Sequence, residues 1–209
     1  GVNLIGSCMN DEDVCCDAAR HEIIRRYYYA LCNLAEKGDN ENEVNKIGLL
    51  LKQAKITTDY RKCTVAAKER KDKEGGVPSS AIELQDGTII TARTSALLGP
   101  SAALILNATK YLAGIPNEVK LIPEEMIEPI QRTKLEFLHG NNPRLHTDEV
   151  LVAISMLSNQ DENCRKALEQ LPSLRGCQVH STVMLSEVDH KIFKKLGVGL
   201  TCDPVKKIK

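Results

Sequence analysis

Two short stretches of the chain gather side chains that can do chemistry. The first is Asn142-Pro-Arg-Leu-His-Thr-Asp-Glu-Val-Leu, and the second, further along, is Leu174-Arg-Gly-Cys-Gln-Val-His-Ser-Thr. Imidazole, thiol, carboxylate and guanidinium groups act as acids, bases, nucleophiles or anion ligands when rigid elements hold them in place. These stretches are therefore the first place to look for a site.

Cys177 and His180 are candidates for a thiol–imidazole pair, in which a base converts the thiol into a reactive thiolate. Residues three apart on a strand point to opposite faces. A pair therefore requires Cys177 to lie on the turn after Gly176, before the strand begins. A buried cysteine beside a hydrogen-bonded strand histidine explains the same pattern, so both interpretations stay open.

His146 stands directly before an expected helix start. Thr147 can cap that helix, and Asp148 and Glu149 favour the positive end of its dipole. Neither HExxH nor the HxE…PCxxC signature is present, so we predict no metal site. Capping does not explain Arg144 or His146, and we expect both to line a ligand pocket, with His146 as a candidate catalytic residue.

A further candidate segment runs from Arg93, at the end of an expected strand, to Ser101, in the first turn of a helix. Free N–H groups at a helix start, together with an arginine, can hold a phosphate or a carboxylate. We add Ser181, next to His180, to the same pocket. The predicted ligand-binding residues are Arg144, His146, Ser181, Arg93 and Ser101. Asp189 and His190 fall in a short charged helix and are expected at the surface.

The expected elements that position these residues follow from apolar spacing and turn signals. Helices are predicted over 11–37, 41–55 and 59–73, before a Gly-Gly linker at 75–76. Asp86-Gly87 predicts a hairpin over 81–93. Further helices are expected over 99–112, 123–138 (weakened at Pro129), 147–157, 161–170 and 186–195, with strands at 178–185 and 197–201. We predict a mixed, helix-rich α/β fold, with a helical subdomain over 1–75 and a small mixed-sheet α/β/α sandwich over 76–209.

Composition argues against several classes of partner. Lys plus Arg and Asp plus Glu number 28 each, and there is no Trp, so neither a basic field nor aromatic stacking platforms favour nucleic acid. No apolar run reaches the roughly 18 residues of a membrane span. The eight cysteines include no CxxC, which favours reduced thiols in the cytoplasm.

The two opening stretches also resemble a protein family. With Gly1-Val-Asn-Leu, His21-Glu-Ile-Ile-Arg-Arg-Tyr-Tyr, Ala81-Ile-Glu-Leu, Thr94-Ser-Ala-Leu-Leu-Gly and Ile127-Glu-Pro-Ile-Gln, they look like a large, mainly prokaryotic family of unknown activity, domain of unknown function eighteen-forty-six. The resemblance implies that this chain is the C-terminal, substrate-facing half of a longer protein, and that the missing N-terminal half is its partner. That half would carry a GxGSGK phosphate loop, so a nucleotide with Mg²⁺ would bind there and no cofactor would bind in this chain.

Two alternatives remain beside a substrate-facing role, and the sequence leaves open whether the protein is an enzyme. One is a Cys-dependent enzyme that uses Cys177. The other is a non-catalytic interaction module, with a homo-oligomer as a candidate assembly. The run Tyr27-Tyr28-Tyr29 supports the interaction module, because helical spacing places one tyrosine in the core, one beside it and one toward solvent or a partner.

Overall fold

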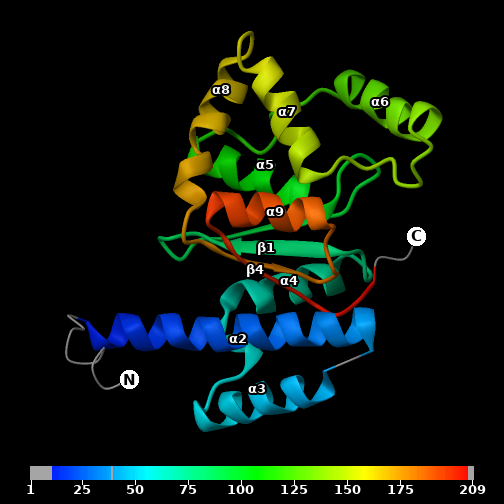
Figure 1. Cartoon of the computed structure of the whole chain (residues 1–209). Helices are drawn as coiled ribbons and strands as arrows, with labels where there is room; N and C mark the ends of the chain where they lie inside the picture. The colour runs from blue at the N-terminus through cyan, green and yellow to red at the C-terminus, as the bar shows by residue number, and fades with distance from the viewer. Residues whose placement is uncertain (1–10, 39, 207–209) are drawn as a thin grey trace. The chain divides into compact units, whose positions relative to one another are not determined.

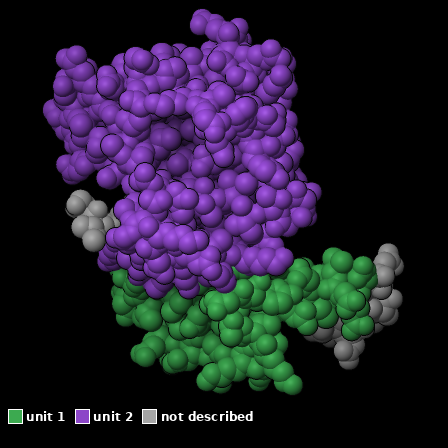
Figure 2. Space-filling model, turned by 180° about the vertical axis from the view of Figure 1, so that it is seen from behind, with its two compact units in different colours: residues 1–61 green, residues 62–209 purple. Residues whose placement is uncertain are grey.

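A computed structural model describes residues 11–38 and 40–206, drawn as ribbons in Figure 1. The chain divides into two compact units, Gly1–Arg61 and Lys62–Lys209, coloured separately in Figure 2. The sequence placed the boundary near residue 75 instead, because a Gly-Gly linker follows three helical patterns. The structure places the third helix in the second unit, because the apolar face of that helix packs on the sheet.

The first unit is helical. It contains α2 (Glu12–Lys37), α3 (Glu41–Gln53) and the short 3₁₀ helix η1 (Thr58–Tyr60). Asp11 caps α2 by accepting the N–H of Val14 at 3.0 Å, and Gly38 ends the helix in the left-handed conformation, with φ of 68°. The helix therefore begins and ends where its capping residues predict.

The three consecutive tyrosines of α2 lie as helical spacing predicts. Tyr28 is buried in a cluster with Ile24 and Leu51, and Tyr27 packs at the edge of that cluster. Tyr29 is 67% exposed. The core of this unit is small and joins α2 to α3.

A four-stranded mixed sheet forms the centre of the second unit, in the order β2-β1-β3-β4. Its strands are β1 (Ser79–Glu83), β2 (Ile89–Arg93), β3 (Gln178–Ser181) and β4 (Gly199–Cys202). β1 is antiparallel to β2 and β3, whereas β3 and β4 are parallel. The predicted hairpin is confirmed: Gly87 has φ of 82°, and the Asp86 carboxylate accepts the N–H of Thr88 at 2.9 Å.

Helices cover both faces of this sheet. Figure 1 shows α4 (Lys62–Lys73) on one face, and α5 (Pro100–Leu112) and α9 (Glu187–Leu196) on the other. α4 buries Cys63 and Ala67 in a cluster with Ala81 of β1. The predicted α/β/α arrangement is therefore confirmed, and α4 belongs with the sheet because its apolar face packs there.

The remaining helices build a second layer of core beside α5. They are α6 (Glu124–Arg132), the π-helical turn η2 (Thr133–Phe137), α7 (Thr147–Leu157), α8 (Glu162–Glu169) and the 3₁₀ helix η3 (Leu171–Leu174). Pro129 lacks an N–H, and the helix changes to π geometry four residues later, where the Thr133 hydroxyl donates to the Pro129 carbonyl at 2.9 Å. No helix in the described ranges combines the length and apolarity needed to cross a bilayer.

We predict that Ile154→Ala weakens this layer strongly. Ile154 is fully buried in the core formed by α5, α7 and α8. Its loss should lower the free energy of unfolding by about 2–5 kcal/mol, through lost burial and a residual cavity. Urea unfolding followed by circular dichroism measures this change. Val152→Ala on the same helix is the matched control, because Val152 is 60% exposed and its loss should cost less than about 1 kcal/mol. Equal effects of the two variants would contradict the packing described here.

Candidate functional site

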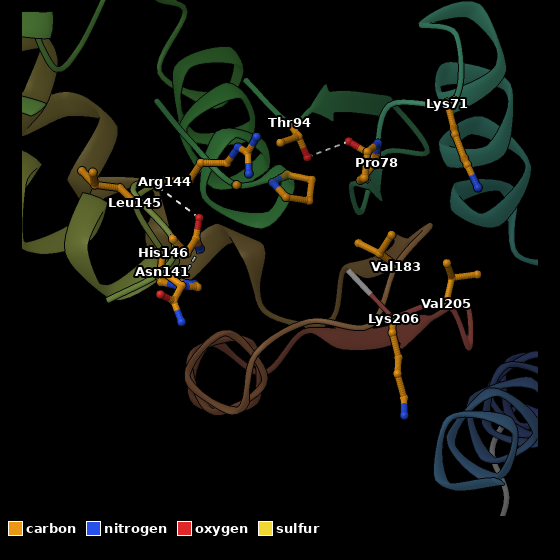
Figure 3. Close-up of a pocket in the computed structure, with 14 residues that line it drawn as sticks. Lys71, Pro78, Thr94, Asn141, Arg144, Leu145, His146, Val183, Val205 and Lys206 are labelled. Carbon is orange, nitrogen blue, oxygen red and sulfur yellow. Dashed lines mark hydrogen bonds between the residues drawn. The ribbon is translucent and has the colours of Figure 1, made fainter. Parts of the chain in front are cut away.

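A cavity of about 520 Å³ opens in the second unit, and Figure 3 shows the side chains that line it. Arg144 and His146 lie on one side and Lys71 of α4 lies on the other, with Pro78 and Thr94 between them. This volume is typical of small-molecule sites. The lining residues are Lys71, Gly76, Pro78, Thr94, Gly99, Pro100, Asn141, Asn142, Arg144, Leu145, His146, Val183, Val205 and Lys206.

Backbone hydrogen bonds fix the loop that carries Arg144 and His146. The N–H of Leu145 donates to the carbonyl of Leu97 at 2.9 Å, and the N–H of Gly99 donates to the carbonyl of Leu145 at 3.1 Å. The Arg144 side chain adds a bond from Nε to the Ser95 carbonyl at 2.8 Å. The loop before α7 and the loop before α5 therefore form one rigid wall of the cavity.

The other flank of this loop is tied to η2. The Lys134 ammonium donates to the Arg144 carbonyl and to the Glu149 carboxylate, both at 2.7 Å. Gly140 donates its N–H to the Lys134 carbonyl at 2.7 Å, and a Cβ at this position would stand 2.9 Å from that same oxygen. Only glycine fits so close an approach, so residue 140 fixes where the loop leaves η2.

Asp189 of α9 is fully buried, and its carboxylate holds the start of α7. Oδ1 accepts the N–H of Thr147 at 3.2 Å and a short hydrogen bond from the Thr147 hydroxyl. Oδ2 accepts the Ser186 hydroxyl at 2.7 Å and lies 3.5 Å from Nδ1 of His146. Burial alone would raise the pKa of Asp189, but the hydrogen bonds from His146, Thr147 and Ser186 outweigh burial and hold the pKa well below its usual range.

The cap of α7 differs from the predicted one. The N-cap residue is His146 rather than Thr147, whose hydroxyl is occupied by Asp189. Glu149 reaches back to accept the His146 N–H at 2.7 Å. The helix end is therefore stabilised by one carboxylate from its own first turn and one from α9.

The imidazole of His146 extends from this capped end to the cavity wall. Its side chain is 27% exposed, with Nδ1 toward Asp189 and Ser186. Nε2 lies 3.3 Å from the side-chain nitrogen of Asn142, another lining residue. A buried carboxylate behind one ring nitrogen orients the other nitrogen for hydrogen bonding or proton transfer.

The charged groups of the described lining residues have one sign. Lys71, Arg144 and Lys206 are cationic, and no aspartate or glutamate is among the residues that line the cavity. Apolar side chains complete the wall, among them Pro100, Leu145 and Val183. Gly99 and Pro100 also place the start of α5, the positive end of a helix dipole, at the cavity. The site suits an organic anion.

The other predicted binding residues lie outside this lining. Arg93 pairs with Glu74, with Nε 3.1 Å from Oε2. Ser101 is buried in the first turn of α5, and Ser181 is buried at the end of β3. The structure therefore brings together Arg144 and His146 of the predicted set and leaves Arg93, Ser101 and Ser181 elsewhere.

His180 and Cys177 do not form the pair considered above. His180 is buried, with Nδ1 2.9 Å from the Thr201 hydroxyl and Nε2 3.3 Å from the Asp203 carboxylate. The Cys177 thiol is 3.7 Å from the Ser173 carbonyl, and burial raises its pKa. Among the described residues, no hydrogen bond joins the Cys177 sulfur to an imidazole.

Sequence reasoning placed Asp189 at the surface, and this was wrong. The surface prediction rested on the short charged helix that carries Asp189, and charge along a helix does not report which side chain is buried. Ser186 does cap α9, accepting the N–H of Asp189 at 3.2 Å, but the carboxylate also reaches α7: Oδ2 accepts the Ser186 hydroxyl and Oδ1 accepts the N–H of Thr147. Asn142, Lys71 and Lys206 were also not among the predicted binding residues.

Metal coordination has no candidate cluster in the part of the chain that the structure describes, since no three His, Cys, Asp or Glu side chains are suitably gathered there. Among the cavity residues, Arg144 and the lysines can bind anions, and His146 can form hydrogen bonds or transfer a proton.

Comparison with known proteins identifies the family. A model of "Domain of unknown function DUF1846, C-terminal" matches residues 59–208, and its N-terminal counterpart matches residues 1–55. The chain belongs to the DUF1846 family. A "UPF0371 protein" of Corynebacterium aurimucosum is 47% identical over 98% of this chain and 41% of its own length. Another of Streptococcus sanguinis is 41% identical with the same coverage.

These matches correct one expectation about partners. The family resemblance implied that the chain is the C-terminal half of the DUF1846 protein, with the N-terminal half as a missing partner. That was wrong, because residues 1–55 match the N-terminal family model and residues 59–208 match the C-terminal one. The chain spans about two fifths of the length of these curated relatives, and it includes sequence from both family domains.

We predict that Asp189→Asn destabilises the protein at neutral pH by about 1–3 kcal/mol, because it weakens the charge-assisted bonds to Thr147 and Ser186. The pKa of Asp189 is lower in the folded state than the unfolded value of about 3.9, so its contribution is present above that pH. The contribution is lost as pH falls below that value, and the stabilities of the two proteins should converge.

Urea unfolding at neutral pH and in acid measures this difference. Glu187→Gln is the control, because this exposed carboxylate of the same helix pairs with Lys191 in solvent and should change stability by less than about 0.5 kcal/mol. A constant difference between wild type and Asp189→Asn across the pH range would count against an ionised, hydrogen-bonded Asp189.

We also predict that the Cys177 thiol is unreactive in the folded protein. Its burial and raised pKa both disfavour the thiolate that reacts with iodoacetamide. Exposed Cys16 of α2 provides an internal comparison. Peptide mass spectrometry after brief alkylation should find Cys16 modified well before Cys177. Preferential modification of Cys177 would restore the thiol-enzyme alternative.

Proposed function

We propose that this chain forms the substrate-binding region of a cytoplasmic phosphate-loop protein, and that its cavity holds a small organic anion such as a phosphorylated metabolite. The observation that carries the proposal is the lining itself. Lys71, Arg144 and Lys206 are among the residues that line a volume of about 520 Å³, and no aspartate or glutamate is among the described lining residues. Positive charge in a concave site attracts and holds anions.

Arg144 is the residue expected to contribute most to binding. Its Nε is engaged by the Ser95 carbonyl, which fixes the guanidinium plane and leaves the terminal nitrogens as donors. A pre-positioned guanidinium binds a phosphate through paired, charge-assisted hydrogen bonds. Apolar neighbours such as Leu145 and Val183 would cover the carbon part of the ligand.

The phosphate loop is the part of this proposal that rests on family resemblance. No GxGSGK sequence occurs in the 209 residues, so a nucleotide with Mg²⁺ would bind outside them. The chain would then supply the substrate side of the reaction, with His146 as its candidate acid or base. Cys-dependent catalysis receives no support from the geometry of Cys177.

The test is a binding screen on the chain with inorganic phosphate, sugar phosphates and nucleotides, read by calorimetry and by NMR shifts. We predict that Arg144→Gln weakens the binding of any phosphorylated ligand by at least about tenfold, the effect of one lost charge-assisted hydrogen bond. The affinity of Arg144→Lys should lie between those of the wild type and Arg144→Gln, because lysine keeps the charge but loses the planar pair of donors.

Arg93→Gln is the matched control, since Arg93 pairs with Glu74 and is not among the lining residues. Its affinity should stay close to that of the wild type. The proposal fails if no anionic ligand in the screen binds, or if Arg93→Gln and Arg144→Gln weaken binding equally.

A further inference from the structure

Hydrogen bonding around Asn142 determines which nitrogen of His146 carries the proton. The Asn142 side-chain oxygen accepts the N–H of Arg144 at 3.2 Å, which fixes the orientation of the amide. The amide nitrogen therefore faces His146, 3.3 Å from Nε2. An amide nitrogen can only donate, so Nε2 must accept and the ring proton lies on Nδ1.

The opposite side of the ring agrees with this tautomer. Nδ1 lies 3.5 Å from Oδ2 of Asp189 and 3.5 Å from the Ser186 hydroxyl oxygen, at the outer limit of a hydrogen bond. Ser186 already donates its proton to Asp189 at 2.7 Å, so both oxygens are acceptors toward the ring. A proton on Nδ1 satisfies them, whereas a lone pair there would face two acceptors.

We propose that the cavity selects an oxyanion that keeps a hydroxyl proton, as hydrogen phosphate does, over a fully deprotonated oxyanion such as sulfate. His146 Nε2 is the selecting atom, and it accepts the hydrogen bond of the ligand hydroxyl. This inference rests on the proposed anion site and names the class of ligand that the site takes.

The selection follows from the lone pair on Nε2. Arg144 attracts phosphate and sulfate alike, because both are compact oxyanions. An unprotonated Nε2 accepts a hydrogen bond from an O–H group and repels a bare anionic oxygen. The ligand hydroxyl would replace the Asn142 amide at Nε2, and that amide would then donate to a ligand oxygen.

Charged groups surround the His146 ring on several elements. Asp189 faces Nδ1 from α9, and Glu149 of α7 accepts the backbone N–H of His146. Lys134 of η2 neutralises Glu149, and Arg144 stands two residues before His146 in the loop. Once the imidazole is protonated, Nε2 becomes a donor and the preference for a ligand hydroxyl is lost.

The experiment compares inorganic phosphate with sodium sulfate on the wild-type chain, by NMR titration. At about pH 8 histidine side chains are neutral, and both ions carry the same double negative charge but differ by one O–H group. We expect phosphate to bind about tenfold more tightly than sulfate, the effect of one hydrogen bond made against one repelled oxygen.

His146→Gln should remove the preference at about pH 8, since its amide can present either oxygen or nitrogen to the ligand. His190→Gln, on exposed α9 surface outside the lining, should keep it. The wild-type comparison needs no variant and decides the matter if His146→Gln does not fold. Nitrogen NMR of the ligand-free protein should find the His146 proton on Nδ1.

The remaining outcomes distinguish failure of the proposed selection from failure of the proposed anion site. Equal affinity for phosphate and sulfate on the wild type at about pH 8 overturns the selection and leaves the anion site standing. A proton on Nε2 of His146 in the ligand-free protein has the same consequence. Failure of both ions to bind at all removes the selection, and failure of every phosphorylated ligand as well removes the proposed function.

Discussion

The arrangement around the cavity depends on one buried carboxylate. Asp189 of α9 accepts the N–H and the hydroxyl of Thr147, and its other oxygen faces Ser186 and His146. An isolated buried charge would be costly, but this one is met by hydrogen-bond donors and by the positive end of α7. Those same bonds link α7 to α9, the helix that covers β4. The carboxylate that holds the start of α7 therefore also connects the helical layer to the sheet.

The Asp189 carboxylate at the start of α7 also helps to orient the His146 ring. The residue is both the N-cap of α7 and a wall of the cavity, so the carboxylate that stabilises the helix end also lies behind the imidazole, 3.5 Å from Nδ1. The Arg144 side of the loop is held independently, by Ser95, Leu97 and Lys134. Binding side chains fixed from several separate segments lose little freedom when a ligand arrives, which favours affinity.

Local signals in the sequence were sufficient for most elements and insufficient for the site. Asp11 and Gly38 delimit α2, and Asp86-Gly87 makes the hairpin, because caps and turns depend on neighbours along the chain. Asp189 obeys the local cap pattern equally well, yet its carboxylate binds Thr147, 42 residues away. Nothing in the spacing of Ser186 and Asp189 reports that partner, because only the packing of α9 beside α7 provides it.

Two pairs of candidate residues show why residue type alone does not identify a site. Cys177 and His180 are close in sequence, but the strand that follows Cys177 buries His180 between Thr201 and Asp203, and the thiol is buried separately. Arg144 and His146 are as close in sequence and do meet in one cavity, because the short parallel pairing of Leu98 with Leu145 leaves their side chains beside the start of α5. An extended segment that pairs with a neighbouring segment at only one residue can leave polar side chains at a cavity. In a central strand, buried polar side chains need hydrogen-bond partners within the fold. His180 and His146 therefore differ in how far the backbone around each one is paired: His180 lies in a central strand, and His146 follows a single bridged residue.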